Sequence, residues 1–219
     1  MKKLFLVIAV AVLAVAATSC DVSKEAKIKT LVGEYVQNLL YIPDSYDPVE
    51  FVIDSAFTPR GDPEFWEFMM DAREDFESAQ SDLRSCEYDI ESAERSMSYY
   101  DDMRYYGGLS SYERRAYNRA KEELAEHQAR KSEIEEKIKS IKSEIKEWRN
   151  VEPEFIGYIA IHSYRAKNNM GNVLMGGLIC FIDKEMTRVV AAYDTESMEI
   201  KELTNFMEQI NDGDIDLDE

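Results

Sequence analysis

The feature that most constrains the fold is a heptad pattern of apolar residues within the stretch 62–152, which is highly charged and nearly free of proline. Its apolar positions alternate spacings of three and four, first over 69–100 and again over 117–148. A period of 3.5 residues places one apolar seam along a helix and favours left-handed supercoiling of two such helices. The pattern predicts two long helices of about 40 residues each, which at about 1.5 Å per residue gives a rod of about 60 Å.

The segment YYGGLSSYE between the two seams predicts that the helices fold back as an antiparallel hairpin. Gly107 and Gly108 permit the left-handed backbone of a helix end, and Ser110 or Ser111 can cap the next helix. Tyrosine is favoured in contact surfaces, so the tip is a candidate interaction site, although self-packing of the hairpin end is an equal alternative. The candidate residues are Tyr99, Tyr100, Tyr105, Tyr106 and Tyr112.

Strand signals flank the hairpin on both sides. Residues 49–57 read as one strand, and three more strands follow at 154–166, 172–183 and 187–194 because these runs are rich in β-branched and aromatic residues. Helical spacing of apolar residues predicts one helix over about 28–40 and another over about 197–210. The fold class is therefore α+β, a small helix-plus-antiparallel-sheet base (28–61 and 153–210) with a long inserted antiparallel coiled-coil hairpin (62–152).

The first twenty residues have the layout of a secretory signal peptide: Lys2 and Lys3, a short apolar run over 4–17, then small residues. These small residues lead into Cys20, an arrangement that resembles a bacterial lipobox. The resemblance implies removal of residues 1–19, acylation of Cys20 with chains such as palmitate, and a polar tether over 20–27. The expected location is a cell envelope, on the periplasmic or surface side of a bacterial membrane. Cleavage after Ala16, which would release a soluble protein, is the alternative.

Net charge limits the partners. The chain carries 44 acidic and 26 basic residues, a formal charge of −18. Such a surface disfavours nucleic acid, whose phosphates require clustered cations, and leaves adhesion to the bilayer to the acyl chains. Two histidines and no CxxC offer too few ligands for a structural zinc site, so no metal and no cofactor is expected.

Several other features favour structural interpretations. A Cys86–Cys180 disulfide is not expected, because Cys86 lies roughly 33 Å along the hairpin from its base. His127 and Lys131 occupy seam positions near the tip, where register-fixing polar residues are favoured over a pH or metal site. The acidic tail over 211–219 lacks the glycine and glutamate that an EF-hand loop requires, so a disordered terminus is expected.

Two stretches, PDSYDPVEFVIDSAFT and HSYRAKNNMGNVLMGGLICFIDKEMTRVV, resemble small uncharacterised lipoproteins of Bacteroides-type bacteria. In that family a helix, a Pro-Asp-Ser-Tyr turn and a strand precede a Tyr-Arg-Ala-Lys-Asn motif that opens a β-meander. The resemblance covers roughly 28–58 and 154–194, and Met170 stands where relatives usually carry phenylalanine. It implies a cystatin-like base, with a helix laid against a curved antiparallel sheet. It implies no activity and no catalytic residues.

Polar residues gather near one strand end and form a weak candidate ligand site: His162, Tyr164, Arg165, Lys167 and Asn168. Alternation along a strand places 162 and 164 on one face and 165 and 167 on the other, so these side chains do not converge unless the strand bends. A lone histidine beside a turn is the favoured interpretation. Ser55, within Asp-Ser-Ala, also resembles an O-glycosylation site of such bacteria.

Two functions remain after these exclusions. The first is a membrane-anchored, non-enzymatic protein-interaction or spacer module with an envelope protein partner at the hairpin tip. The second is a small-ligand-binding or hydrolytic cystatin-like domain that uses the sheet.

Overall fold

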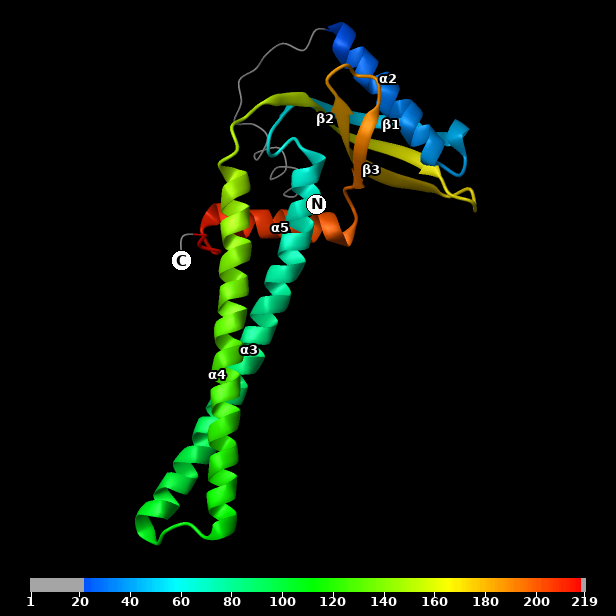
Figure 1. Ribbon diagram of the computed structural model, residues 1–219. Helices are drawn as coiled ribbons and strands as arrows, with labels where there is room; N and C mark the ends of the chain where they lie inside the picture. Colours follow the sequence, from blue (N-terminus) through cyan, green and yellow to red (C-terminus); the bar gives the residue numbers. More distant parts are fainter. Residues whose placement is uncertain (1–21, 218–219) are drawn as a thin grey trace. The chain divides into compact units, whose positions relative to one another are not determined.

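The computed structural model (Figure 1) describes residues 22–217 of the 219-residue chain. It confirms the predicted α+β class, with an antiparallel sheet of four strands and two long helices that pack against each other. The elements in chain order are α2 (Val22–Leu39), the 3-10 turn η1 (Pro43–Ser45), β1 (Asp47–Phe57), α3 (Pro63–Tyr106), α4 (Ser111–Arg149), β2 (Phe155–Lys167), β3 (Val173–Asp183), β4 (Val189–Asp194) and α5 (Met198–Asp212).

The chain divides into two compact units. The sheet unit extends to Met70 and resumes over Glu147–Asp216, and the hairpin unit holds Asp71–Lys146. The first two turns of α3 thus belong with the sheet, although the sequence pattern assigned everything after residue 61 to the hairpin. Trp66 explains the difference, since its ring centroid lies 5.3 Å from that of Phe181 on the sheet.

The sheet has the order β1-β2-β3-β4, and each neighbouring pair is antiparallel. Phe57 at the end of β1 pairs with Phe155 at the start of β2, as predicted for strands that the hairpin separates in sequence. β1 and β4 are the edge strands.

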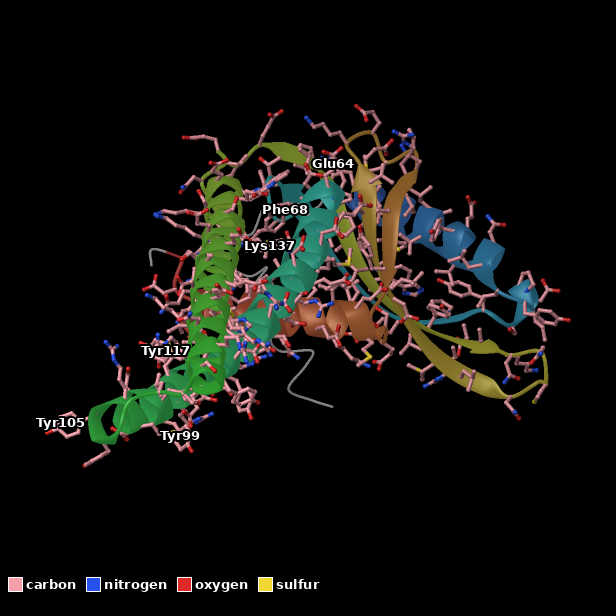
Figure 2. The ribbon with its side chains drawn as sticks, turned by 60° about the horizontal axis from the view of Figure 1, so that its bottom comes forward. Glu64, Phe68, Tyr99, Tyr105, Tyr117 and Lys137 are labelled. Atoms are coloured by element: carbon pink, nitrogen blue, oxygen red, sulfur yellow. The ribbon has the colours of Figure 1, made fainter. Side chains whose placement is uncertain are left out.

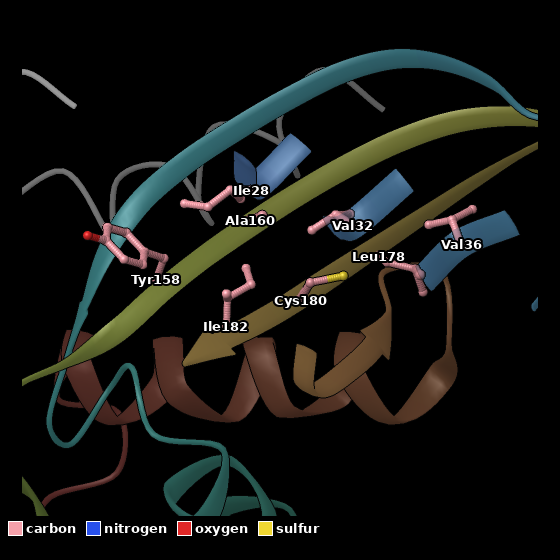
Figure 3. Close-up of a cluster of buried hydrophobic side chains, with 8 residues drawn as sticks. All are labelled: Ile28, Val32, Val36, Tyr158, Ala160, Leu178, Cys180 and Ile182. Atoms are coloured by element: carbon pink, nitrogen blue, oxygen red, sulfur yellow. The ribbon is translucent and has the colours of Figure 1, made fainter. Parts of the chain in front are cut away.

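The core of the sheet unit lies between α2 and one face of the sheet (Figure 3). Ile28, Val32 and Val36, spaced four residues apart, form a stripe on α2 and are completely buried. They pack in one cluster with side chains from β2 and β3, namely Tyr158, Ala160, Leu178, Cys180 and Ile182. Figures 1 and 2 both show the sheet lying between α2 and α5.

Helix α2 begins at Val22, so the described part of the predicted tether is helical. The prediction relied on the apolar stripe, which starts at Ile28. The preceding residues extend the helix for a different reason: they are good helix formers, and Glu25 lies in the first turn, where a negative charge is favourable. Glu25 Oε1 also lies 2.6 Å from Lys29 Nζ one turn later.

The expectation of a disordered tail is wrong for the described residues after α5. Gly213 adopts a left-handed backbone (φ 83°) and ends the helix. The chain then turns back, the N–H of Ile215 donates to the carbonyl of Gln209 at 3.1 Å, and the Ile215 side chain is buried. An apolar side chain within an acidic run therefore orders the segment.

The hairpin unit has an antiparallel register that ion pairs identify. Lys137 Nζ lies 2.6 Å from Asp75 Oδ1, and Lys131 Nζ lies 2.7 Å from Glu87 Oε1. A residue later in α3 therefore pairs with a residue earlier in α4, as in an antiparallel pair. Most buried seam residues of α3 in this unit are small, among them Ala79, Cys86 and Ala93, which allows close approach of the helices, and Phe76 is the large exception.

The turn of the hairpin has the predicted chemistry. Gly108 has φ 78°, in the left-handed region. Ser110 caps α4: its Oγ accepts from the N–H of Glu113, and its own N–H donates to the Glu113 carboxylate at 2.7 Å.

The register predicts that the hairpin can be shortened without loss of the fold. Deleting 84–106 and 111–133 joins Leu83 to Ile134 through the native turn and removes equal lengths of both arms. We expect the shortened chain to keep its strand signal in circular dichroism and to unfold cooperatively, because loop-closure terms change slowly with length. An insoluble or non-cooperative product would contradict the insertion architecture.

Candidate functional site

His162, on β2, is the one buried polar side chain among the described residues of the core. Its Nδ1 lies 2.8 Å from the carbonyl oxygen of Glu50, and its Nε2 lies 2.8 Å from the hydroxyl of Tyr46. The Phe51 ring stacks on the imidazole, with centroids 3.7 Å apart and planes at 11°. The Tyr164 ring lies on another side at 5.6 Å. The imidazole is thus enclosed by three aromatic rings.

These contacts fix the tautomer of His162. A carbonyl oxygen only accepts, so Nδ1 carries the proton and donates to Glu50. The neutral ring then accepts the Tyr46 O–H at Nε2. Burial lowers the pKa of His162, and the bond to Glu50 offsets this only in part. Burial, with smaller contributions from Cys180 and Tyr164, raises the pKa of Tyr46 to about 12. Both groups are neutral near pH 7, and both ring nitrogens are engaged.

Two glycines lie against the tyrosines beside His162. A Cβ on Gly33 of α2 would lie 3.4 Å from the Tyr46 hydroxyl, an ordinary contact. A Cβ on Gly176 of β3 would lie 2.6 Å from Cζ of Tyr164, so a larger residue there would force the Tyr164 ring to shift. Glycine at 176 therefore allows the present position of the ring.

The structure brings together only two of the five residues predicted as a ligand site. His162 and Tyr164 share the face that α2 covers, whereas Arg165 is paired with Asp47 at 3.6 Å. The N–H of Lys167 donates to Ser45 Oγ at 2.8 Å, and Asn168 Oδ1 accepts from the N–H groups of Met170 and Asn172. Lys167 and Asn168 thus contribute backbone and turn contacts.

The interpretation of His162 as a lone histidine is incomplete, because sequence analysis missed Tyr46 and Phe51 as its partners. Tyr46 belongs to the Pro-Asp-Ser-Tyr turn, and Phe51 pairs directly with His162 across the strands. Continuous pairing from Phe57 and Phe155 would place Phe51 opposite Ile161, and the register shift between Ala56 and Phe57 brings Phe51 opposite His162 instead. The Tyr46 contact depends on the conformation of the turn.

An open groove of about 580 Å³ runs beside this cluster, between α2 and the first half of β1. Its lining residues are Lys29, Thr30, Gly33, Glu34, Gln37, Tyr46, Pro48, Val49, Glu50 and Phe51. Lys29 is engaged by Glu25, and its ammonium lies 5.8 Å from the centre of the Phe51 ring. The groove is open to solvent, and Tyr46 links it to the buried histidine.

The tyrosines of the hairpin tip form two edge-to-face pairs, Tyr99 with Tyr100 at 5.4 Å and Tyr105 with Tyr106 at 5.1 Å. Tyr105 and Tyr106 are each 85% exposed and Tyr112 is 72% exposed, whereas Tyr100 is partly buried. Figure 2 shows Tyr105 and Tyr99 at the end of the hairpin. Tyr105 and Tyr106 therefore contact each other without being buried in the helix seam.

The remaining polar seam residues have structural partners. The carbonyl of His127 accepts from the Cys86 thiol at 3.1 Å, and Lys131 pairs with Glu87 and Glu135. Cys86 and Cys180 are both free and buried. Within residues 22–217 no group of three or more potential metal ligands converges. In the same part of the chain, no helix combines the length and apolar character needed to cross a membrane. Cys20 lies outside the described residues.

Comparison of the chain with protein-family models, with curated proteins and with solved structures found no match.

The buried state of His162 predicts a specific pH dependence of stability. Its folded-state pKa lies below its unfolded-state pKa of about 6.5, so the unfolded chain binds the proton first. The His162 contribution is full above about pH 6.5 and is lost as pH falls toward the folded-state pKa. At pH 7.5 we expect His162→Gln to reduce the free energy of unfolding by about 1–3 kcal/mol, through weakened buried hydrogen bonds. That difference should shrink by pH 5.

Urea unfolding at constant ionic strength measures this change. Tyr46→Phe is the matched control, since it removes the bond to Nε2 but leaves the histidine titratable. It should lower stability while keeping the pH slope of the native chain. A difference between the native chain and His162→Gln that is constant from pH 7.5 to 5 would contradict the prediction.

Proposed function

We propose that this protein is a membrane-anchored lipoprotein of a bacterial cell envelope, similar to uncharacterised lipoproteins of Bacteroides-type bacteria. It works as a non-enzymatic interaction or spacer module. Lipid on Cys20 holds the chain at a membrane, and the tyrosine-bearing tip of the α3–α4 hairpin binds an envelope protein.

The exposure of the tip tyrosines is the observation that carries this proposal. Tyr105, Tyr106 and Tyr112 present large amphipathic rings with few rotatable bonds, so little conformational entropy is lost when a partner covers them. Aromatic side chains of this kind are enriched at the centres of protein interfaces.

The state of His162 supports a non-enzymatic role. A general base needs a free nitrogen within reach of a substrate proton, and both nitrogens of His162 already have partners. Burial lowers the pKa of His162, so the imidazole stays uncharged, and its two hydrogen bonds hold it in place. Arg165, another residue of the candidate ligand site, is paired with Asp47.

The groove between α2 and β1 favours a second candidate function, the binding of a small ligand by a cystatin-like domain. Tyr46 lines this groove, and its hydroxyl can accept a hydrogen bond while it donates to His162. Co-purification of a small molecule whose retention is lost in Tyr46→Phe would favour this function over the first.

The anchor is tested by Cys20→Ser. We expect the native chain to partition into the detergent phase and to carry a mass increase on Cys20. The variant should lack that mass increase, remain uncut before position 20 and shift toward the soluble fraction, because the acyl chains supply the membrane affinity. Equal partitioning of the two chains, with no added mass on Cys20, would rule out lipidation.

The contact role of the tip is tested by joint change of Tyr105, Tyr106 and Tyr112 to Ser. The melting temperature should change little, because surface substitutions usually alter stability by less than about 0.5 kcal/mol. Capture of the partner from crosslinked cell envelopes should be lost. Tyr88→Ser is the matched control, since Tyr88 is 67% exposed on the same helix and should leave capture intact. A large fall in melting temperature would show that the tyrosines stabilise the hairpin end.

A further inference from the structure

The ends of β2 and β3 form a two-stranded ribbon without flanking strands. Pairing of β1 with β2 begins at Asp47 and Arg165, and pairing of β4 with β3 begins at Leu178 and Asp194. Residues 166–176, here called the end ribbon, lie at this end: Ala166 and Lys167 pair with Leu174 and Val173, and Met175 and Gly176 pair with Arg165 and Tyr164. Figure 1 shows the turn between β2 and β3 at an extremity of the sheet.

The end ribbon carries a concentration of exposed apolar side chains. Met170 is 81% exposed, and three consecutive residues of β3 are also more than half exposed: Val173 at 59%, Leu174 at 56% and Met175 at 60%. Single exposed apolar residues are normal, but several within six positions mark a contact surface.

These apolar side chains occupy both faces of the ribbon. Val173 pairs with Lys167 and Met175 with Arg165, so they share one face, while Leu174 pairs with Ala166 on the opposite face. A single flat protein surface can cover only one face of a two-stranded ribbon. The apolar layer of a lipid bilayer is fluid and can therefore cover both faces of the ribbon.

The turn at the end of the ribbon satisfies its own backbone groups. The side-chain oxygen of Asn168 accepts from the N–H groups of Met170 and Asn172, both at 3.0 Å. The N–H of Gly171 donates to the carbonyl of Asn168, and that of Asn168 to the carbonyl of Asn172, both at 2.9 Å. Unpaired backbone groups are costly away from water, so such a turn tolerates an apolar environment.

The charge pattern also sets this ribbon apart. Acidic residues make up 44 of 219 positions, yet none occurs from Ser163 to Ile182. The charged side chains of this stretch are Arg165, paired with Asp47, and Lys167, and Asp44 lies in the neighbouring turn η1. The end ribbon therefore carries no acidic residue and one basic residue, Lys167, whereas the acidic remainder of the surface is repelled by anionic lipid.

We propose that the end ribbon enters the interfacial layer of a lipid bilayer, with Met170 and Leu174 among the inserted side chains. This inference rests on the proposed membrane location, and it adds a second membrane contact besides the N-terminal anchor. The turn η1 adjoins the ribbon through the bond from the Lys167 N–H to Ser45 Oγ, and Tyr41, in the segment leading to η1, is 78% exposed and is of a residue type that suits the level of the lipid headgroups.

A pair of single labels tests the proposal in the full chain reconstituted into vesicles of phosphatidylethanolamine and phosphatidylglycerol. An environment-sensitive fluorophore is attached to Met170→Cys or, as a matched control, to Met198→Cys. Met198 is 75% exposed in the same unit. Cys86 and Cys180 are buried and should not compete for the label. We expect iodide quenching to be several-fold weaker at position 170 than at 198, with blue-shifted emission only at 170.

A second variant identifies the cause of the protection. Adding Leu174→Ser and Met175→Ser to the Met170→Cys chain should restore quenching, since apolar burial drives insertion. Equal, strong quenching at both labelled positions would overturn the proposal. Protection at 170 that appears without vesicles and grows with protein concentration would also overturn it, because the ribbon would then bind a second copy.

Separate measurements distinguish an absence of lipid on Cys20 from an absence of ribbon insertion. Lipidation is measured by the mass of Cys20, whereas ribbon insertion is measured by the fluorophore. If Cys20 proves unmodified and the chain soluble, the same label pair in a Cys20→Ser background is measured after vesicles are added. Protection at 170 then supports the ribbon contact alone, and its absence refutes it.

Discussion

The packing of α2 onto one face of the sheet is the interaction on which the sheet unit depends. Ile28, Val32 and Val36 are completely buried at successive helical turns, and Ala160 beneath them is small enough for close approach. Each such aliphatic side chain contributes about 1.5–3 kcal/mol when fully buried. The chemistry of His162 follows from this packing, because the same face that receives α2 also encloses the imidazole. Its neutral state is thus a consequence of core formation.

The hairpin unit is held together differently. Its seam buries small residues such as Ala79 and Ala93 together with a few large ones such as Phe76, and its cross-helix ion pairs are exposed. Exposed pairs contribute little stability, typically below about 1 kcal/mol, but opposite charges at matched positions favour one register over others. The hairpin therefore gains its specificity of alignment from charge and its stability from a narrow apolar contact.

Periodicity accounts for what the sequence could predict. The heptads over 69–100 and 117–148 indicated both long helices, and the strand runs indicated the antiparallel sheet with β1 beside β2. Each of those elements is indicated by a pattern that many residues repeat, so no single tertiary contact changes it. The start of α2 and the ordered segment after α5 were missed because they depend on helix propensity near Glu25 and on one buried residue, Ile215.

The candidate site was less accessible to prediction. Strand alternation correctly separated His162 from Arg165, but it could not reveal that a tyrosine from a distant turn completes the hydrogen bonding of the imidazole. That contact depends on how η1 positions Tyr46 against Gly33, which is a property of the tertiary fold. The exposure of the tip tyrosines likewise could not be separated from self-packing by spacing alone.

The insertion between β1 and β2 also has a consequence for the order of folding. Phe57 and Phe155 pair across about 100 residues of chain, a closure that is slow when the intervening segment is unstructured. Helix hairpins form from local contacts in microseconds to milliseconds. Once α3 and α4 have paired, the chain returns to within about 10 Å of where it left, the usual spacing of packed helices. Pairing of the helices thereby shortens the effective loop between β1 and β2. We expect β1 to join the sheet only after α3 and α4 have paired.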